Sequence, residues 1–204
     1  MTPQHNRQHH HHHRHETLSR TDQNHSSGFS RRRFLACTAI ATTAGLAGCL
    51  GNDDDDAPPA EPIALTGGRE CAVCGMVIED HYGPAGQVFY DDDDDDPVTY
   101  DSLTELLVHH DEQRQRGTDA RGVFVTDYSS VDYDLEEQGG SPYISTHAEQ
   151  EAFADATELL YLVDSAIHGA MGPDHVPFSS REDAEALRED VGGEIREWDD
   201  LVEG

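Results

Sequence analysis

The chain has 204 residues, a formal net charge of −29 and no lysine, because its 13 Lys-or-Arg positions are all arginines. A field this negative repels nucleic acid and anionic bilayer surfaces, so neither is expected as a binding partner. The aspartate blocks at residues 53–56 and 91–96 lack the spaced oxygen ligands and the turn glycine of a calcium-binding loop. They indicate instead a solvated acidic surface suited to high salt, as in a halophile.

The first 49 residues predict export. Residues 1–29 form a low-complexity, histidine-rich leader, to which we assign no function. Residues 30–49 carry consecutive arginines, an apolar run too short to span a bilayer comfortably, and a closing Leu-Ala-Gly-Cys. This order resembles a twin-arginine lipoprotein signal that is cut before Cys49, whose thiol then receives lipid. An uncleaved N-terminal anchor is the alternative, and either would tie the rest of the chain to the extracytoplasmic side of the cell membrane.

The next part of the chain is predicted to be a tether followed by a folded unit. Residues 50–64 are acidic, contain prolines and lack apolar periodicity, which indicates a tether. Within residues 65–135, residues 86–90 read as a strand and residues 98–113 as an extended segment that leads into a helix. Residues 122–128 read as a further strand, so this half predicts a ββαβ unit.

Residues 136–204 repeat the same order. Residues 158–165 read as a strand, residues 176–190 as an extended segment leading into a helix, and residues 194–201 as a strand. This half therefore predicts a second ββαβ unit that is similar to the first.

Matching helix starts support the repeat. Ser102 is followed three residues later by Glu105, and Ser180 by Asp183, which is the pattern of an N-cap hydroxyl and an acidic residue in the first turn. The expected fold class is therefore α+β, with small antiparallel sheets covered by helices.

Cys71 and Cys74, in a C-x-x-C pair, are the two cysteines expected to remain unmodified, because Cys37 lies in the predicted signal and Cys49 would carry lipid. A structural zinc site needs four ligands, and the histidines form no obvious second pair. A thioredoxin-like dithiol needs a helix that begins at the first cysteine, whereas a glycine follows Cys74 and residues 76–80 read as extended. A redox pair, a structural disulfide and a copper(I) site all remain open.

The methionines favour copper(I). Met76 lies two residues after Cys74, and thiolate and thioether sulfurs are the soft donors that select monovalent copper. Met171 lies between small residues in a predicted turn, where packing in a core does not explain it. His168 and His175 flank this turn, and either could add a nitrogen donor.

These residues resemble the NosL family of nitrous-oxide reductase accessory lipoproteins. The resemblance rests on Cys71-Ala-Val-Cys74-Gly-Met76, on Met171-Gly-Pro with the following Val-Pro-Phe, and on the helix, paired glycine and final strand of residues 184–201. It implies two ββαβ units and a copper(I) site made by Cys71, Cys74 and Met76, with Met171 as the fourth candidate.

The resemblance also implies a function. The chain is expected to be a non-enzymatic, lipid-anchored copper(I) chaperone that delivers copper to nitrous-oxide reductase, directly or through its maturation proteins. The alternative is an anchored thiol–disulfide oxidoreductase that uses Cys71 and Cys74.

Overall fold

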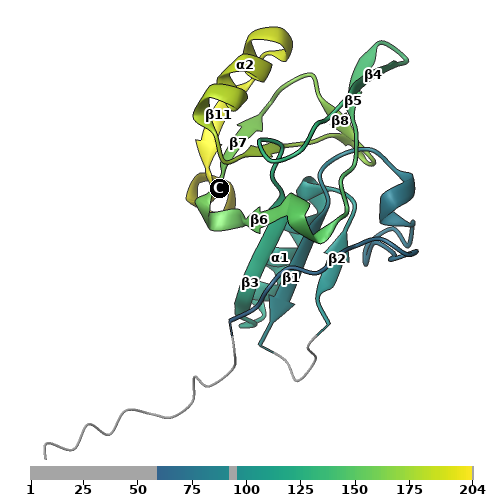
Figure 1. Cartoon of the computed structure of the whole chain (residues 1–204). Helices are drawn as coiled ribbons and strands as arrows, with labels where there is room; N and C mark the ends of the chain where they lie inside the picture. The colour runs from purple at the N-terminus through teal and green to yellow at the C-terminus, as the bar shows by residue number, and fades with distance from the viewer. Residues whose placement is uncertain (1–58, 92–95, 204) are drawn as a thin grey trace, which may run out of the picture. The chain divides into compact units, whose positions relative to one another are not determined.

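The computed structural model describes residues 59–91 and 96–203 (Figure 1). The predicted leader, the twin-arginine signal with Cys49 and the tether as far as residue 58 lie outside the described residues. In the described part, no helix has both the length and the apolar character that crossing a membrane requires.

The first sheet is built around β1 (Gly86–Tyr90), which pairs antiparallel with β2 (Val98–Tyr100) and β3 (Ala120–Thr126). Helix α1 (Leu103–Gln115) follows β2 and packs on β1 and β2. Strand β6 (Phe153–Asp155), from later in the chain, extends the sheet by pairing with β3. The sheet order is therefore β2-β1-β3-β6.

The second sheet has the same plan. Its central strand β7 (Leu160–Val163) pairs antiparallel with β10 (Val176–Phe178) and β11 (Glu194–Glu197). Helix α2 (Arg181–Val191) lies between β10 and β11 in the chain and contacts all three strands. In both sheets the first strand of the unit is central and the helix follows the second strand, so the predicted pair of ββαβ units is confirmed. The boundaries 65–135 and 136–204 stay a prediction.

The two predicted helix caps are present. Ser102 Oγ accepts a hydrogen bond from the amide of Glu105 at 3.4 Å, and Ser180 Oγ accepts one from the amide of Asp183 at 3.3 Å. Each hydroxyl satisfies an amide that has no partner within its helix, so these serines set where the helices begin.

A third sheet was not predicted. It has the order β4-β5-β8-β9, and its strands are β4 (Leu135–Gln138), β5 (Ser141–Ile144), β8 (His168–Gly169) and β9 (Gly172–Pro173). The pairing of β5 with β8 is parallel, whereas the other pairings are antiparallel. Strands β8 and β9 have two residues each, which is too short to show the alternation of polar and apolar residues by which strands are recognised in a sequence.

Two expected extended segments are partly helical. The strand expected over residues 194–201 ends at Glu197, and α3 (Trp198–Val202) follows. The Asp200 carboxylate accepts a hydrogen bond from the Glu197 amide at 3.3 Å, and the Trp198 ring is buried. A local cap and tertiary packing therefore start this helix together. Residues expected to be extended after Cys74 instead form a 3-10 turn, η1 (Ile78–Asp80). Two further 3-10 turns are η2 (Gln150–Ala152) and η3 (Ala156–Glu158).

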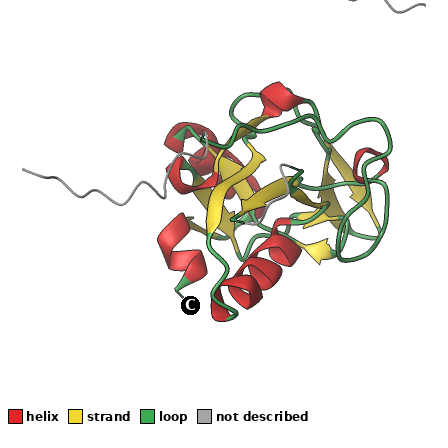
Figure 2. Ribbon diagram, turned by 90° about the horizontal axis from the view of Figure 1, so that it is seen from below, coloured by secondary structure: helices red, strands yellow, loops and turns green. Residues whose placement is uncertain are grey.

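The core crosses both units. One cluster joins Tyr100 and Leu106 of the first unit to Tyr161 and Trp198 of the second. A second cluster packs residues near the start of the described chain against the first sheet, and it includes Cys71. A third lies between α2 and the second sheet. Figure 2 shows the helices, in red, around the outside of the strands, and α1 and α2 contact the strands of their own sheets, so the expected covering of small sheets by helices is confirmed.

Candidate metal centre

The two cysteines lie in a short turn closed by backbone hydrogen bonds. The Cys71 amide donates to the carbonyl of Met76 at 2.8 Å, and the Gly75 amide donates to the carbonyl of Cys71 at 2.9 Å. Gly75 has φ 73°, a left-handed conformation that glycine adopts without steric cost. A single antiparallel bridge between Glu70 and Val77 closes the base of the turn.

This turn is fastened to the first sheet. The Ala72 amide donates to the carbonyl of Thr99 in β2 at 2.8 Å, and the Thr99 hydroxyl donates to the carbonyl of Glu70 at 2.8 Å. Thr99 is two residues before Asp101, which lies between β2 and the start of α1. The cysteine turn is therefore held beside the Asp101 carboxylate.

Cys71, Cys74 and Asp101 form one cluster. Their ligand atoms lie within 4.8 Å of one another, and they are the only such group of three or more His, Cys, Asp and Glu side chains among residues 59–91 and 96–203. Both cysteines are free thiols; Cys71 is 2% exposed and Cys74 is partly buried. The expected proximity of Cys71 and Cys74 is thus seen, with an additional acidic neighbour.

Asp101 was missed in the sequence. Asp101 is 2% exposed. Its Oδ2 accepts a hydrogen bond from the Cys74 thiol at 3.2 Å. Its Oδ1 is buried and has no hydrogen-bond partner in the described part of the chain. The one sequence signal is its position directly before the N-cap Ser102, between the strand β2 and the helix α1. Nothing in that pattern connects it with cysteines nearly 30 residues earlier, because the contact exists only in the folded chain.

The environment keeps Cys74 protonated at neutral pH. Burial raises the pKa of Cys74 to about 11, and the hydrogen bonds to Asp101 and Cys71 add to the rise, whereas a backbone hydrogen bond near Met76 opposes it. Cys74 is therefore a hydrogen-bond donor to Asp101, and a metal ion must displace this proton to bind the sulfur.

Met171 lies at the tip of a tight hairpin, as the sequence predicted. Gly169 pairs with Gly172 and His168 with Pro173, so Ala170 and Met171 form a two-residue turn. The Met171 side chain is 47% exposed, which confirms that it does not fill a core. The His168 ring packs edge-on against Tyr143, with ring centroids 5.2 Å apart.

Asp174 attaches this hairpin to the segment that carries Asp101. Its carboxylate accepts hydrogen bonds from the amides of Leu103 and Thr104 at 3.2 and 2.9 Å and from the Thr104 hydroxyl at 3.0 Å. The side chain is buried; burial raises the pKa of Asp174, and the hydrogen bonds from His175, Thr104 and Ser102 oppose that rise. The hairpin that bears Met171 is therefore tied to the first turn of α1, which begins two residues after Asp101.

Among the predicted nitrogen donors, neither His168 nor His175 belongs to the cluster of Cys71, Cys74 and Asp101. Met76 contributes its carbonyl to the cysteine turn, and its side chain is partly buried. The His168 ring makes the edge-on contact with Tyr143 in the third sheet. Burial lowers the pKa of His175, and its Nδ1 is buried without a hydrogen-bond partner in the described part of the chain. Cys71 and Cys74 are thus brought together, and His168 and Met171 lie on the hairpin of β8 and β9, so Met76 and Met171 as ligands stay a prediction.

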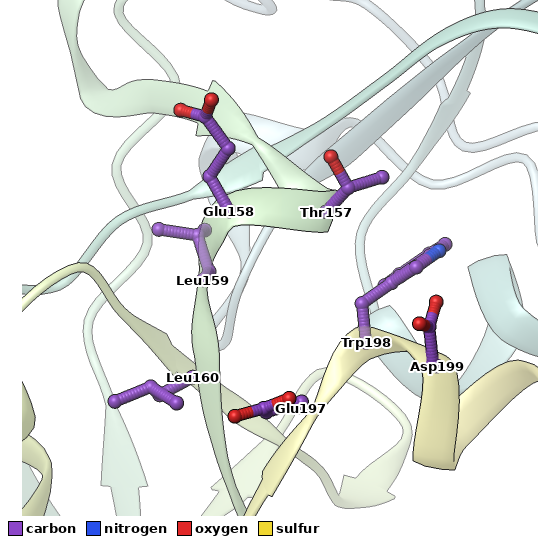
Figure 3. Close-up of a pocket in the computed structure, with 7 residues that line it drawn as sticks. All are labelled: Thr157, Glu158, Leu159, Leu160, Glu197, Trp198 and Asp199. Carbon is purple, nitrogen blue, oxygen red and sulfur yellow. The ribbon is translucent and has the colours of Figure 1, made fainter.

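A surface hollow of about 260 Å³ lies elsewhere, between the turn before β7 and the start of α3 (Figure 3). Its charged groups are Glu158, Glu197 and Asp199, and neither sulfur nor imidazole lines it. The carboxylates of Glu158 and Asp199 lie apart in Figure 3. The hollow therefore lacks the soft donors of the cysteine cluster.

Comparisons with known proteins find similar sequences and a similar fold. A model of the NosL family matches residues 62–204. The copper-binding lipoprotein NosL of Stutzerimonas stutzeri is 28% identical over 163 residues, which cover 80% of this chain and 77% of that protein. The crystal structure of the copper chaperone NosL from Shewanella denitrificans is similar with a TM-score of 0.55 and 25% identity, over 70% of this chain and 96% of that one. Because the family match spans well over half of the sequence, including every site residue described above, the chain belongs to the NosL family.

Proposed function

We propose that this protein is a copper(I) chaperone. The observation that carries the proposal is the pair of free thiols Cys71 and Cys74, held side by side in a turn fixed to the sheet. Thiolates select copper(I) over the hard cations that are plentiful in salt water. The two named relatives, a copper-binding lipoprotein and a copper chaperone, support the same assignment.

In this proposal each candidate ligand has a role. Cys71 and Cys74 hold the ion as thiolates, and Met76 and Met171 supply thioether sulfur. Met171, exposed on a hairpin, is suited to a donor that engages and releases an ion. His168, at the base of the same hairpin, is the nitrogen donor in this assignment.

The location and the client belong to the same proposal. The signal at residues 30–49 and the lipid on Cys49 would anchor the protein to the extracytoplasmic face of the cell membrane, with residues 50–64 as its tether. The copper would be delivered for maturation of nitrous-oxide reductase, directly or through its maturation proteins. The protein itself would catalyse no reaction.

The test is anaerobic titration of the reduced full chain with copper(I) against a competing chelator. Cys71→Ser and Cys74→Ser are each expected to lower the affinity by more than about 100-fold, because loss of even an outer partner of a metal ligand costs 10–100-fold. The variant that carries both Cys71→Ser and Cys74→Ser measures copper(I) binding by the leader histidines and the other cysteines. This background binding is subtracted from that of the wild type. If neither cysteine variant nor Met76→Leu changes the affinity, the site is wrongly assigned.

Delivery is tested separately from binding. Copper-loaded protein, incubated with copper-deficient nitrous-oxide reductase and its maturation proteins, is expected to raise the copper content of the reductase. Cys71→Ser loaded with the same total copper is the control. Equal transfer by both proteins would contradict the proposed route.

The thiol–disulfide oxidoreductase is less well supported. The cysteine turn is not the start of a helix, so it lacks the helix N-terminus that lowers the pKa of the attacking cysteine in thioredoxin-like sites. Such an enzyme would exchange disulfides with substrates and would be indifferent to Met171→Leu. Exchange activity that survives Met171→Leu and is lost in Cys71→Ser would favour it over the chaperone.

A further inference from the structure

Strand β4 forms an exposed edge of the third sheet. It lies at the end of the order β4-β5-β8-β9, and all four of its residues are exposed. Figure 1 shows the β4–β5 hairpin projecting at the upper right, beyond the other strands. Two other sheet edges are covered by neighbouring segments: at β2 the Ala72 amide donates to the Thr99 carbonyl, and at β10 the Tyr128 amide donates to the Pro177 carbonyl.

The register of the hairpin determines which backbone groups of β4 point outward. Glu137 lies opposite Pro142, which has no N–H, so this pair exchanges no hydrogen bonds. Bonded and non-bonded pairs alternate in an antiparallel ladder, so Leu135 and Glu137 direct their N–H and C=O groups away from β5. No backbone hydrogen bond from these two residues to another segment is seen among the described residues. Two donors and two acceptors are therefore available to a further strand.

Contacts on the inner side hold this edge in an extended conformation. The Asp134 amide donates to Ser145 Oγ, and the Ser145 amide donates to the Asp134 carbonyl, each at 3.0 Å. The Tyr82 hydroxyl donates to the Glu136 carboxylate at 2.7 Å. A strand that pairs with β4 would therefore meet an edge that is already ordered, which lowers the entropic cost of binding.

The charge around β4 has one sign. Residues 122–180, which include the whole third sheet, contain 11 aspartates and glutamates and no lysine or arginine. Glu136 and Glu137 place two of these charges in β4 itself. The edge strand β11 differs, because its Arg196 pairs with Glu194 at 3.1 Å. A second copy of β4 is repelled by such an edge, whereas a strand that carries positive charge is attracted.

We propose that β4 is a docking edge for an extended, arginine- or lysine-rich segment of a partner protein, which pairs with β4 as an added strand. Leu135 is 40% exposed and offers an apolar contact on the face that it shares with Glu137. The strand contains no proline, and its register with β5 has no bulge, so neither device that blocks strand addition is present in β4.

The added strand would lie in the same sheet as the exposed thioether. Strand β5 pairs with β4 on one side and with β8 on the other, and β8 leads into the hairpin that bears Met171. The inference goes beyond the copper assignment and does not depend on it, so its tests use the metal-free chain.

The probe is a short synthetic peptide of alternating arginine and valine. A matched peptide has proline in place of each valine, so it keeps the charge but cannot pair as a strand. Amide hydrogen exchange of the metal-free full chain, followed by NMR, should be faster at Leu135 and Glu137 than at Glu136 and Gln138 before peptide is added. An excess of the alternating peptide should slow exchange at Leu135 and Glu137 by at least about tenfold, and the proline peptide should not.

Two outcomes of this measurement would overturn the proposal. Unchanged exchange at Leu135 and Glu137 in excess alternating peptide would show that no strand is added. Equal slowing by both peptides would show attraction of charge without strand pairing.

Substitutions at Glu137 separate the backbone contact from the charge. Glu137→Pro removes the outward N–H without removing a hydrogen bond to β5, and Glu137→Gln removes only the charge. Calorimetry should show that affinity for the alternating peptide falls by about tenfold in Glu137→Pro and by less in Glu137→Gln. Glu185→Gln, which removes an exposed carboxylate from α2, is the charge-matched control and should bind like the wild type.

Equal affinity in Glu137→Pro and Glu137→Gln would mean that the outward N–H is not used, and would reject strand pairing. Thermal melting establishes that each variant is folded, and the exchange measurement on the wild type decides the question if Glu137→Pro is not. Slow exchange that grows with protein concentration in the absence of peptide would assign the edge to a second copy of the chain and reject the basic partner. Copper(I) affinity should be the same in Glu137→Pro and the wild type, so this proposal and the copper assignment can fail separately.

Discussion

The carboxylate of Asp174 accepts hydrogen bonds from both the backbone amide and the hydroxyl of Thr104, which lies 70 residues earlier in the chain. One residue of the second unit thereby caps the helix of the first, in addition to that helix's own cap Ser102. Asp174 lies three residues after Met171, so the same contact ties the hairpin that bears the exposed thioether to the segment that carries Asp101.

Removing this cap should reduce both stability and copper binding. Asp174→Ala leaves the buried amides of Leu103 and Thr104 without their acceptor, and should lower the free energy of unfolding by about 1–3 kcal/mol. Asp174→Asn keeps one acceptor oxygen and should cost less. Denaturant unfolding measures both, and Asp132→Ala, an exposed acid, is the control.

A double-mutant cycle separates positioning from general destabilisation. If Asp174 positions Met171, Asp174→Ala should lower the copper(I) affinity of the wild-type chain. The same substitution should cause little further loss in a chain that already carries Met171→Leu. Losses that simply add in the double variant would mean that Asp174 stabilises the fold and does not position the thioether.

Met171→Leu should separate binding from folding. The side chain is 47% exposed and leucine has a similar volume, so the free energy of unfolding should change by less than about 0.5 kcal/mol. Copper(I) affinity should nevertheless fall, because the thioether is lost. Unfolding curves and chelator competition on the same preparation measure the two quantities. A stability loss as large as that of Asp174→Ala would contradict the assignment of Met171 to a free hairpin tip.

Alkylation of the metal-free protein should reveal the protonated state of Cys74. With a pKa of about 11, the thiolate fraction is small at neutral pH, and the rate with iodoacetamide should keep rising up to about pH 11. Asp101→Asn should shift this profile to lower pH, because it removes a carboxylate that accepts the thiol proton and repels the thiolate. Peptide mapping distinguishes Cys74 from the other cysteines. A midpoint near pH 9 in the pH profile of its alkylation rate in the wild type would be inconsistent with the buried environment.

Two glycines with left-handed backbones should respond differently to alanine. At Gly83, with φ 100°, an added Cβ would lie 2.6 Å from the Cα of Gly169, so Gly83→Ala should cost more than about 2 kcal/mol of stability. At Gly67, with φ 79°, nothing lies within 4 Å of the added atom, and only the backbone cost of about 1–2 kcal/mol applies. Denaturant unfolding compares the two, and equal losses would argue against tight packing of Gly83 on the Met171 hairpin.

The sequence was sufficient wherever local chemistry decides the structure. Ser102 and Ser180 cap their helices because each precedes a first turn with a suitable acid, and both strands that precede these helices are apolar enough to recognise. The same holds for Met171, whose glycine-rich neighbours predict a turn and whose exposure confirms it.

The sequence was insufficient where distant segments meet. Asp101 joins Cys74, and Asp174 joins α1, through contacts that span 27 and about 70 residues and leave no local pattern. The strands β8 and β9 are held by their partners more than by their own composition. The helix α3 takes the place of only the second half of the strand predicted over residues 194–201, because the Trp198 ring is buried against Tyr161, with centroids 5.9 Å apart.

The cysteine pair has unequal access to solvent: Cys71 is 2% exposed, and Cys74 is only partly buried. An ion held between them, as proposed, would be closed off on the Cys71 side and reachable on the Cys74 side. A donor group from another protein would then meet the ion beside Cys74, and the bond to Cys71 would be the last to break. Loading and unloading would both pass through an ion shared between Cys71 and the visiting molecule.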